Sequence, residues 1–206
     1  RKAPPVRAGR AGGSADAAAV LVGPNALYDA RLSMSELCAL GAELGADVPF
    51  ALLGGTCRVQ GKGDLLRPLP PCPDCRFVVV MPSVGVSTPA AFAAYDRMGS
   101  TVHPDGAAAE AAVRAGDLYA LCGAMGNALE ECSGAGETPR IKELLRHSGA
   151  LAALMTGSGA AVFGVFDDPE RAEAARAALA KEYRQVYLAA PDHGGARLAP
   201  APKHHG

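Results

Sequence analysis

Three short segments hold the residue types that could do chemistry, and the first of them is rich in glycine. It reads A8-G-R-A-G-G-S-A15 and leads into an Ala-rich stretch with near-helical spacing of its apolar residues. Glycine lets the backbone approach a ligand, and the free N–H groups and dipole at a helix start favour a phosphate. The Ser14 hydroxyl could also reach a phosphate or Mg²⁺. Because the segment matches neither common nucleotide-binding pattern, a flexible loop with Ser14 as helix N-cap is the alternative.

The second segment, G45-A-D-V-P-F50, holds a carboxylate at Asp47 just before an apolar run. A carboxylate in this place could accept a proton from a hydroxyl or orient that hydroxyl. Aspartate is also a common turn residue that bonds to its own backbone, and this is the alternative for Asp47.

The third segment, T156-G-S-G-A-A161, lies between two apolar runs that predict strands. A Gly-Ser-Gly turn held by two strands presents backbone N–H groups to an anion. An ordinary hairpin turn uses the same residue types, so this segment alone does not decide between the two interpretations.

The cysteines and the remaining charged residues add little chemistry. Cys72-Pro-Asp-Cys75 is a C-x-x-C pair, which could be redox-active or form half of a zinc site. Zinc needs about four ligands, no second pair lies at a suitable spacing and no βαβ pattern surrounds the motif, so we interpret the pair as a coincidence. Six cysteines in 206 residues are too sparse for a disulfide scaffold and are expected to be reduced thiols of an intracellular protein. Asp167-Asp168 before a proline is expected to cap a helix. The basic residues of that helix are expected to form a solvated face: Arg171, Arg176, Lys181 and Arg184.

The composition is that of a folded globular protein. The chain has 206 residues, of which 49% are hydrophobic and 20% charged, and its net charge is −1. This length gives one domain or two small ones. The balanced charge argues against a nucleic-acid binder, and no apolar run approaches the ~20 residues of a membrane span. We therefore expect no nucleic-acid or membrane partner, and the oligomeric state stays open.

The periodicity of the chain predicts mixed helices and strands, hence the α+β class with antiparallel pairing. Ser33 and Glu36 fit a capping box at the start of a helix, and Pro89 suits the first turn of another that begins at Ser87 or Thr88. Further helical patterns follow Ser14 and cover residues 105–129, 139–147 and 170–183. Strands are expected at residues 50–53, 56–60, 65–69, 77–81 and 185–191 and on both sides of the third segment.

In this order, the segments resemble the GHMP kinase family. PPVRAGRAGGSADAAAVL is similar to the second motif of that family, and MTGSGAAVFGVF is similar to its third. GADVPFALLGG, PSVGVSTPAAFAAYD and N127-A-L-E130 are similar to the members that act on 4-diphosphocytidyl-2-C-methyl-D-erythritol. The resemblance runs from Pro5 to about Tyr187, and four ordered motifs are far more specific than any one of them.

The resemblance implies two subdomains with a cleft between them: a ribosomal protein S5 domain 2-like N-terminal part, incomplete in this chain, and a ferredoxin-like C-terminal part. It implies an ATP-binding domain at residues 1–72, a C-terminal domain at 73–191 and a disordered tail at 192–206. The implied activity is ATP-dependent phosphorylation of the substrate's 2-hydroxyl in the non-mevalonate, methylerythritol phosphate route to isoprenoids. ATP and Mg²⁺ are the implied cofactors, and the implied location is the cytoplasm, with a plastid left open.

The resemblance also implies roles for individual residues. Asp47 matches the catalytic aspartate, which would face the substrate hydroxyl. Thr88, Gly157, Ser158 and Gly159 match residues on the substrate side, and Ser14 could contact the metal of Mg-ATP. The implied ATP-binding residues are Pro5, Val6, Arg7, Ala8, Gly9, Arg10, Ala11, Gly12, Gly13, Ser14 and Ala15.

The sequence departs from the family pattern in two ways. Arg10 stands where the family has a hydrophobic residue, and its cation could either lie near the phosphates or perturb the loop. Pro4 stands where the family has an Ile or Leu. The family's first strand and loop, similar to A-P-A-K-I-N-L and carrying a catalytic lysine, has no match in the sequence. We therefore expect a C-terminal fragment with impaired activity, exposed sheet edges and reduced stability. A catalytically inactive nucleotide-binding remnant and another GHMP small-molecule kinase are the alternatives.

Overall fold

The computed structural model describes residues 12–99 and 102–199, which fall into two compact units. The helical unit consists of residues 12–71 together with 192–199, and the sheet unit consists of residues 72–191 without 100 and 101. Helices and strands occur in both units, so the fold belongs to the α+β class, as predicted.

The helical unit packs three helices around a small apolar core and adds a two-stranded antiparallel ribbon. The core consists of Ala18, Leu37, Val48 and Leu52, one or two from each helix. The predicted capping box is confirmed, because the Ser33 hydroxyl accepts from the Glu36 N–H and the Glu36 carboxylate accepts from the Ser33 N–H. The elements are α1 (Gly12–Leu27), α2 (Met34–Leu44), α3 (Val48–Leu53), β1 (Cys57–Gln60) and β2 (Leu65–Pro68).

The prediction of a strand at residues 50–53 is wrong, because these residues end the helix α3. A short apolar run reads alike as a buried strand or a buried helix, so periodicity could not separate the two. Pro49 in the first helical turn and Gly54 at the C-terminal end with φ of 65° are helix boundary signals. The helical spacing places Val48 and Leu52 on the same buried side.

Residues 192–197 do not fray as expected of a tail, since they pack against α3. The Ala196 N–H donates to the Ala51 carbonyl at 2.9 Å, and Ala196 packs against the apolar core of the helical unit. The approach is closest at Gly54 and Gly195, because a Cβ built on Gly54 would lie 2.1 Å from the Gly195 nitrogen. Two glycines at one contact let the two backbones meet where side chains would clash.

The sheet unit is built on a four-stranded antiparallel sheet in the order β4-β5-β3-β6. The strands predicted at residues 77–81 and 185–191 and around residues 156–159 are all present within one or two residues. The helical pattern at 105–129 forms two short helices. The elements are β3 (Arg76–Val80), α4 (Thr88–Met98), α5 (Gly106–Ala115), α6 (Leu118–Ala124), α7 (Thr138–His147), β4 (Ala152–Met155), β5 (Val162–Phe166), α8 (Pro169–Leu179) and β6 (Val186–Ala189).

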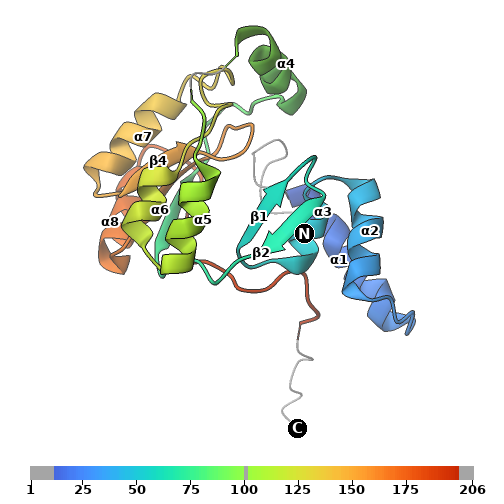
Figure 1. Cartoon of the computed structure of the whole chain (residues 1–206). Coiled ribbons are helices and arrows are strands. Elements are labelled where there is room, and N and C mark those ends of the chain that lie inside the picture. The colour runs from blue at the N-terminus through green and yellow to red at the C-terminus, as the bar shows by residue number, and fades with distance from the viewer. Residues whose placement is uncertain (1–11, 100–101, 200–206) are drawn as a thin grey trace. The chain divides into compact units, whose positions relative to one another are not determined.

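Helices cover both faces of this sheet (Figure 1). The core between the sheet and the helices α7 and α8 includes Val78, Val162 and Phe166 from the sheet and Ile141 and Leu145 from α7, all fully buried. A smaller cluster under α6 fills the other face, where Phe77 and Phe163 meet edge to face at 6.0 Å. The interior therefore holds β4 and its neighbours rigidly.

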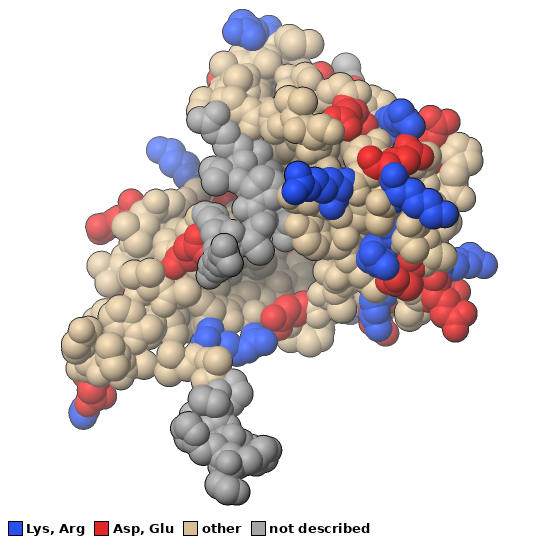
Figure 2. Space-filling model, turned by 180° about the vertical axis from the view of Figure 1, so that it is seen from behind, with Lys and Arg blue, Asp and Glu red and all other residues tan. Residues whose placement is uncertain are grey.

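The exposed surface mixes charges of both signs. The face in Figure 2 shows Lys and Arg side chains next to Asp and Glu side chains. In the sheet unit, Arg140 pairs with Glu182 at 2.6 Å and Arg176 pairs with Glu173 at 2.6 Å. The pair of Arg176 and Glu173 lies on α8 and agrees with the solvated face predicted for that helix. Within residues 12–99 and 102–199, no helix has the length and apolar character needed to cross a membrane.

Candidate functional site

The glycine-rich turn between β4 and β5 is the first part of the candidate site. The strands close on it, with the Thr156 N–H donating to the Ala161 carbonyl at 2.8 Å and the Gly159 N–H to the Thr156 carbonyl at 3.0 Å. Gly157 and Gly159 have φ of 57° and 98°, a conformation that favours glycine. A Cβ on Gly159 would lie 2.8 Å from the Met155 sulfur, so this position also has no room for a side chain.

The turn meets the start of α4, where Thr88 is the first residue. The Thr88 and Ser158 hydroxyls are 2.7 Å apart and share a hydrogen bond across 70 positions of sequence. Val86, Ala91 and Ala160 form a buried apolar cluster that joins α4 to the turn. The predicted substrate-side residues, Thr88 and the 157–159 turn, therefore lie together in the sheet unit.

Polar side chains from other segments bind the backbone of this turn and of the residue before it. The Asn127 side-chain amide donates to the Met155 and Gly157 carbonyls, each at 2.8 Å. The Glu130 carboxylate accepts from the Met155 N–H at 3.0 Å and forms an ion pair with Lys142 of α7. From the sequence, these residues carried only a family resemblance: Asn127 and Glu130 lie in N127-A-L-E130, and Lys142 lies in the similar run IKELLRHSGALAALM, residues 141–155. Neither segment indicated that the three side chains meet at this turn.

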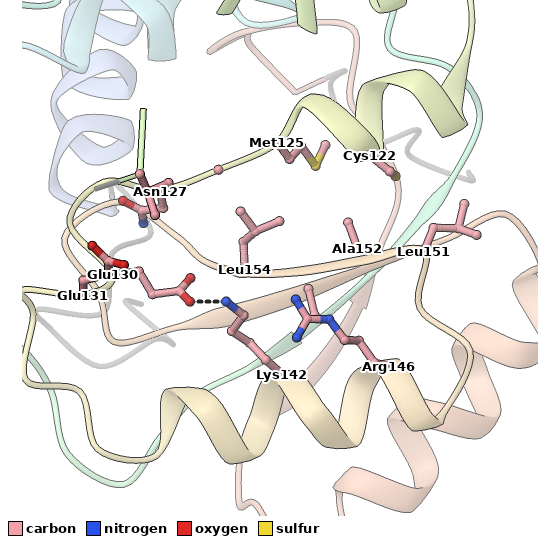
Figure 3. Close-up of a pocket in the computed structure, with 13 residues that line it drawn as sticks. Cys122, Met125, Asn127, Glu130, Glu131, Lys142, Arg146, Leu151, Ala152 and Leu154 are labelled. Carbon is pink, nitrogen blue, oxygen red and sulfur yellow. Dashed lines mark hydrogen bonds and ion pairs between the residues drawn. The ribbon is translucent and has the colours of Figure 1, made fainter. Parts of the chain in front are cut away.

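These side chains line a cavity of about 410 Å³ along the open edge of β4 (Figure 3). Lys142 and Arg146 extend toward it from α7, and Met125 and Cys122 extend from the opposite side, with Leu154 of β4 between them. Lys142 and Glu130 are 17% and 19% exposed, so their ion pair is largely shielded from solvent.

The glycine-rich segment enters the described structure at α1, in the helical unit. Residues 1–11, and with them Pro5 to Ala11 of the predicted ATP-binding run, lie outside the described residues. Gly12 and Gly13 are already helical, so Ser14 lies in the first turn and is not the N-cap. Glycine tolerates helical dihedrals as well as loop ones, so the glycine pair did not mark the boundary. The first turn carries no acidic side chain, and a Cβ on Gly13 would meet nothing within 4 Å.

Asp47 lies at the N-cap position of α3 in the same unit, and its side chain is exposed. It adopts a helical φ of −89° and ψ of −6°, and its side chain makes no capping hydrogen bond to the helix. The alternative interpretation, in which the Asp47 side chain bonds to nearby backbone, therefore finds no support in a capping hydrogen bond. The carboxylate is open to an outside partner.

A second cavity, of about 420 Å³, lies within the helical unit between α1, α3 and residues 192–197. Ala15 of the predicted ATP-binding run lines it, together with Ala19, Phe50 and Gly54. Asp192 and Arg197 form an ion pair at 3.3 Å on its wall. The wall is otherwise largely apolar.

In the C-x-x-C pair, the two thiols change each other's pKa. Among the described residues, no group of three or more His, Cys, Asp or Glu side chains is arranged to hold a metal ion. A hydrogen bond from the Cys75 thiol lowers the pKa of Cys72 to about 7. The same bond and burial raise the pKa of Cys75.

The fold and the arrangement of these motifs are those of a known kinase family. Residues 1–55 match the GHMP kinases N terminal domain, and residues 108–185 match the GHMP kinases C terminal region. With these matches and the relatives below, the chain belongs to the GHMP kinase family.

Its relatives within that family are 4-diphosphocytidyl-2-C-methyl-D-erythritol kinases. The one from Moorella thermoacetica is 45% identical over 193 residues, which cover 91% of this chain and 68% of the relative. The crystal structure of a 4-(cytidine 5'-diphospho)-2C-methyl-D-erythritol kinase superposes with a TM-score of 0.76 at 34% identity, covering 95% of this chain and 69% of that one. A homoserine kinase from Cytophaga hutchinsonii has a TM-score of 0.78 at 20% identity, which shows a shared fold. The chain thus spans about two thirds of the length of these relatives.

Proposed function

We propose that this chain is an ATP-dependent phosphotransferase that transfers the γ-phosphoryl group of ATP to the 2-hydroxyl of 4-diphosphocytidyl-2-C-methyl-D-erythritol. The observation that carries the proposal is the 45% identity, over nine tenths of the chain, to an enzyme that bears this substrate in its name. The hydrogen-bonded pair of Thr88 and Ser158 beside a glycine-rich turn adds a polar surface suited to a phosphorylated ligand.

The start of α1 is the proposed site for the ATP phosphates. A helix start leaves its first backbone N–H groups without partners inside the helix, and it carries the positive end of the helix dipole, here that of a 16-residue helix. The described first turn of α1 holds no acidic side chain. The open space at Gly13 lets a phosphate approach the backbone. Mg²⁺ bound to the nucleotide would neutralise charge that develops on the transferred group. The Ser14 hydroxyl is the proposed contact to the metal-bound phosphate.

Asp47 is the proposed catalytic residue. In phosphoryl transfer there is little covalent chemistry for the protein to do, so positioning and charge neutralisation provide most of the rate. An exposed carboxylate without a capping bond can orient the attacking hydroxyl and accept its proton as the O–P bond forms. Thr88 and residues 157–159 are proposed to hold the substrate. The products are ADP and a phosphate monoester.

The proposal extends to domains, partners and location. We assign residues 1–72 to the ATP-binding domain and 73–191 to the C-terminal domain. The partner is the small-molecule substrate rather than a nucleic acid, in keeping with the net charge of −1. The reaction is proposed to take place in the cytoplasm.

The test is a coupled ADP assay with ATP, Mg²⁺ and the substrate, in which ³¹P NMR identifies the product monoester. Asp47→Asn should lower kcat by about 10²- to 10⁴-fold, the usual contribution of a general base. Asp29→Asn is the matched control, because Asp29 is an exposed acid of the same unit that pairs with Arg31. Absence of a phosphorylated product from this chain and from any longer form that its gene encodes would refute the proposal. The expected impairment of this chain stays a prediction that the same assay measures.

An inactive nucleotide-binding remnant and another GHMP small-molecule kinase give different outcomes. The remnant would bind ATP without turnover. A different kinase would phosphorylate homoserine or mevalonate in preference, and the Cytophaga homoserine kinase shares the fold at 20% identity. Parallel assays with these two alcohols therefore separate the three functions.

A further inference from the structure

Among the described residues, no strand lies beside the outer edge of β4, and at the end of β4 side chains bind the backbone groups that a neighbouring strand would bind. Because β4 is the edge of the sheet, alternate backbone groups face outward. Thr156 bonds inward to Ala161, so Met155 before it faces outward. Both of its groups are satisfied there: the Met155 N–H by Glu130 and the Met155 carbonyl by Asn127.

The Asn127 amide also sets the orientation of the glycine-rich turn. Its two N–H groups bind carbonyls on either side of Thr156, at Met155 and Gly157. In a trans peptide the N–H points away from the carbonyl of the same unit. Fixing the Gly157 carbonyl therefore directs the Ser158 N–H to the side opposite Asn127. The Oδ1 of Asn127 accepts from the Leu129 N–H at 3.0 Å, which fixes the amide itself.

Lys142 neutralises the charge of the Glu130 carboxylate that binds the Met155 N–H. Glu130 is about four fifths buried, and a carboxylate there is costly unless it is paired. The cation is Lys142 of α7 (Figure 3). Ile141 and Leu145 of the same helix are fully buried against the sheet. The ion pair thus connects the turn to the rigid core of the unit.

We propose that Asn127, Glu130 and Lys142 are positioning residues for phosphoryl transfer: they hold Met155 and the 156–159 turn so that the backbone amide and hydroxyl of Ser158 are fixed for the substrate's diphosphate. The inference rests on the proposed kinase function. These residues lie behind the turn, so they act through Ser158 and Thr88.

The central variant is Asn127→Asp, which keeps the shape of the side chain and removes both N–H donors. It should lower kcat/KM for the cytidyl substrate by about 10- to 100-fold and leave the KM for ATP within twofold. Lys142→Met should have a similar effect, and Lys142→Arg should restore at least half of the wild-type kcat/KM, since the cation is retained. Glu143→Gln, an exposed residue of the same helix, is the control and should match the wild type. Asn127→Asp with kcat/KM within twofold of the wild type would overturn the proposal, as would an equal loss in Lys142→Met and Lys142→Arg.

Amide hydrogen exchange on the ligand-free chain tests the same residues without turnover. In Asn127→Asp, the amides of residues 156–159 should exchange at least tenfold faster, while amides in α8 should keep their wild-type rates. Unchanged exchange in the turn would overturn the positioning role even if the chain has no kinase activity. Faster exchange throughout the sheet unit would also overturn it, because it would show a general loss of stability. Absence of product from the wild-type chain and from any longer form that its gene encodes, together with the expected local exchange, would refute the kinase function alone.

Discussion

The hydroxyl of Thr88 lies 2.7 Å from the hydroxyl of Ser158, although the two residues are 70 positions apart. Thr88 begins a helix, and Ser158 lies in a turn between two strands. The buried cluster of Val86, Ala91 and Ala160 brings these two elements together. The pair is therefore a product of packing in the sheet unit, and it joins two residues that we propose to bind the same ligand.

The bond between these hydroxyls should be measurable by a double-mutant cycle. Thr88→Val and Ser158→Ala should each lower the free energy of unfolding by about 0.5–1 kcal/mol, the net value of an ordinary hydrogen bond. The double variant should cost less than the sum of the two, with a coupling of about 0.5 kcal/mol. Urea unfolding of the four proteins provides the values. Strictly additive costs would show that the hydroxyls do not interact in solution.

A methyl group at Gly54 should strongly destabilise the helical unit. Gly54 has φ of 65° and ψ of −159°, a conformation that is essentially confined to glycine and costs other residues about 1–3 kcal/mol. A Cβ at this position would also meet the Gly195 backbone. We expect Gly54→Ala to cost about 3 kcal/mol in urea unfolding, the sum of this strain and the displaced 192–197 segment. Gly116→Ala is the control, since Gly116 has φ of 68° with nothing within 4 Å, and should cost about 1 kcal/mol. Equal costs for the two variants would contradict the close approach.

The capping box of α2 should make stability depend on pH at the acid end. Hydrogen bonds from Ser33 lower the pKa of Glu36 below its ordinary value of 4.5. A lowered folded pKa means that the stabilising effect is complete above the pKa of the unfolded state and is lost as the pH falls through the folded pKa. Glu36→Gln should thus be less stable than the wild type at pH 7, and the difference should shrink as the pH falls below 4.5 and through the lowered pKa of Glu36. Thermal unfolding across pH 3–7 measures it, and a difference that is independent of pH would contradict this prediction.

Cys72 should react with alkylating agents faster than the other cysteines. Its pKa of about 7 leaves a large thiolate fraction at neutral pH, and burial raises the pKa of Cys38, Cys57 and Cys122. Iodoacetamide at pH 7 followed by peptide mass spectrometry should therefore find Cys72 modified first. Cys75→Ala removes the donor that stabilises the thiolate and should slow labelling of Cys72 several-fold. An unchanged rate in that variant would show that Cys75 does not set this pKa.

The described helices and strands mostly follow local signals that the sequence displays. The capping pair Ser33 and Glu36, Pro89 at the start of α4 and the apolar runs around residues 156–159 each act within a few neighbouring residues, so they are readable from sequence. Predictions failed where a local signal was ambiguous. The run Phe50–Leu53 suits a strand or a helix equally, and glycines before Ser14 suit a loop or a helix.

The sequence by itself determined the family, the kinds of elements and the segments that carry chemistry, because motif spacing and hydrophobic periodicity are local properties of the chain. Tertiary structure alone decided that Ser158 meets Thr88, that Met155 is held by Asn127 and Glu130, and that Lys142 neutralises Glu130. It also decided that residues 192–197 pack on α3. These are contacts between segments far apart in sequence, set by which faces of the elements must be buried together, and no short-range pattern encodes them.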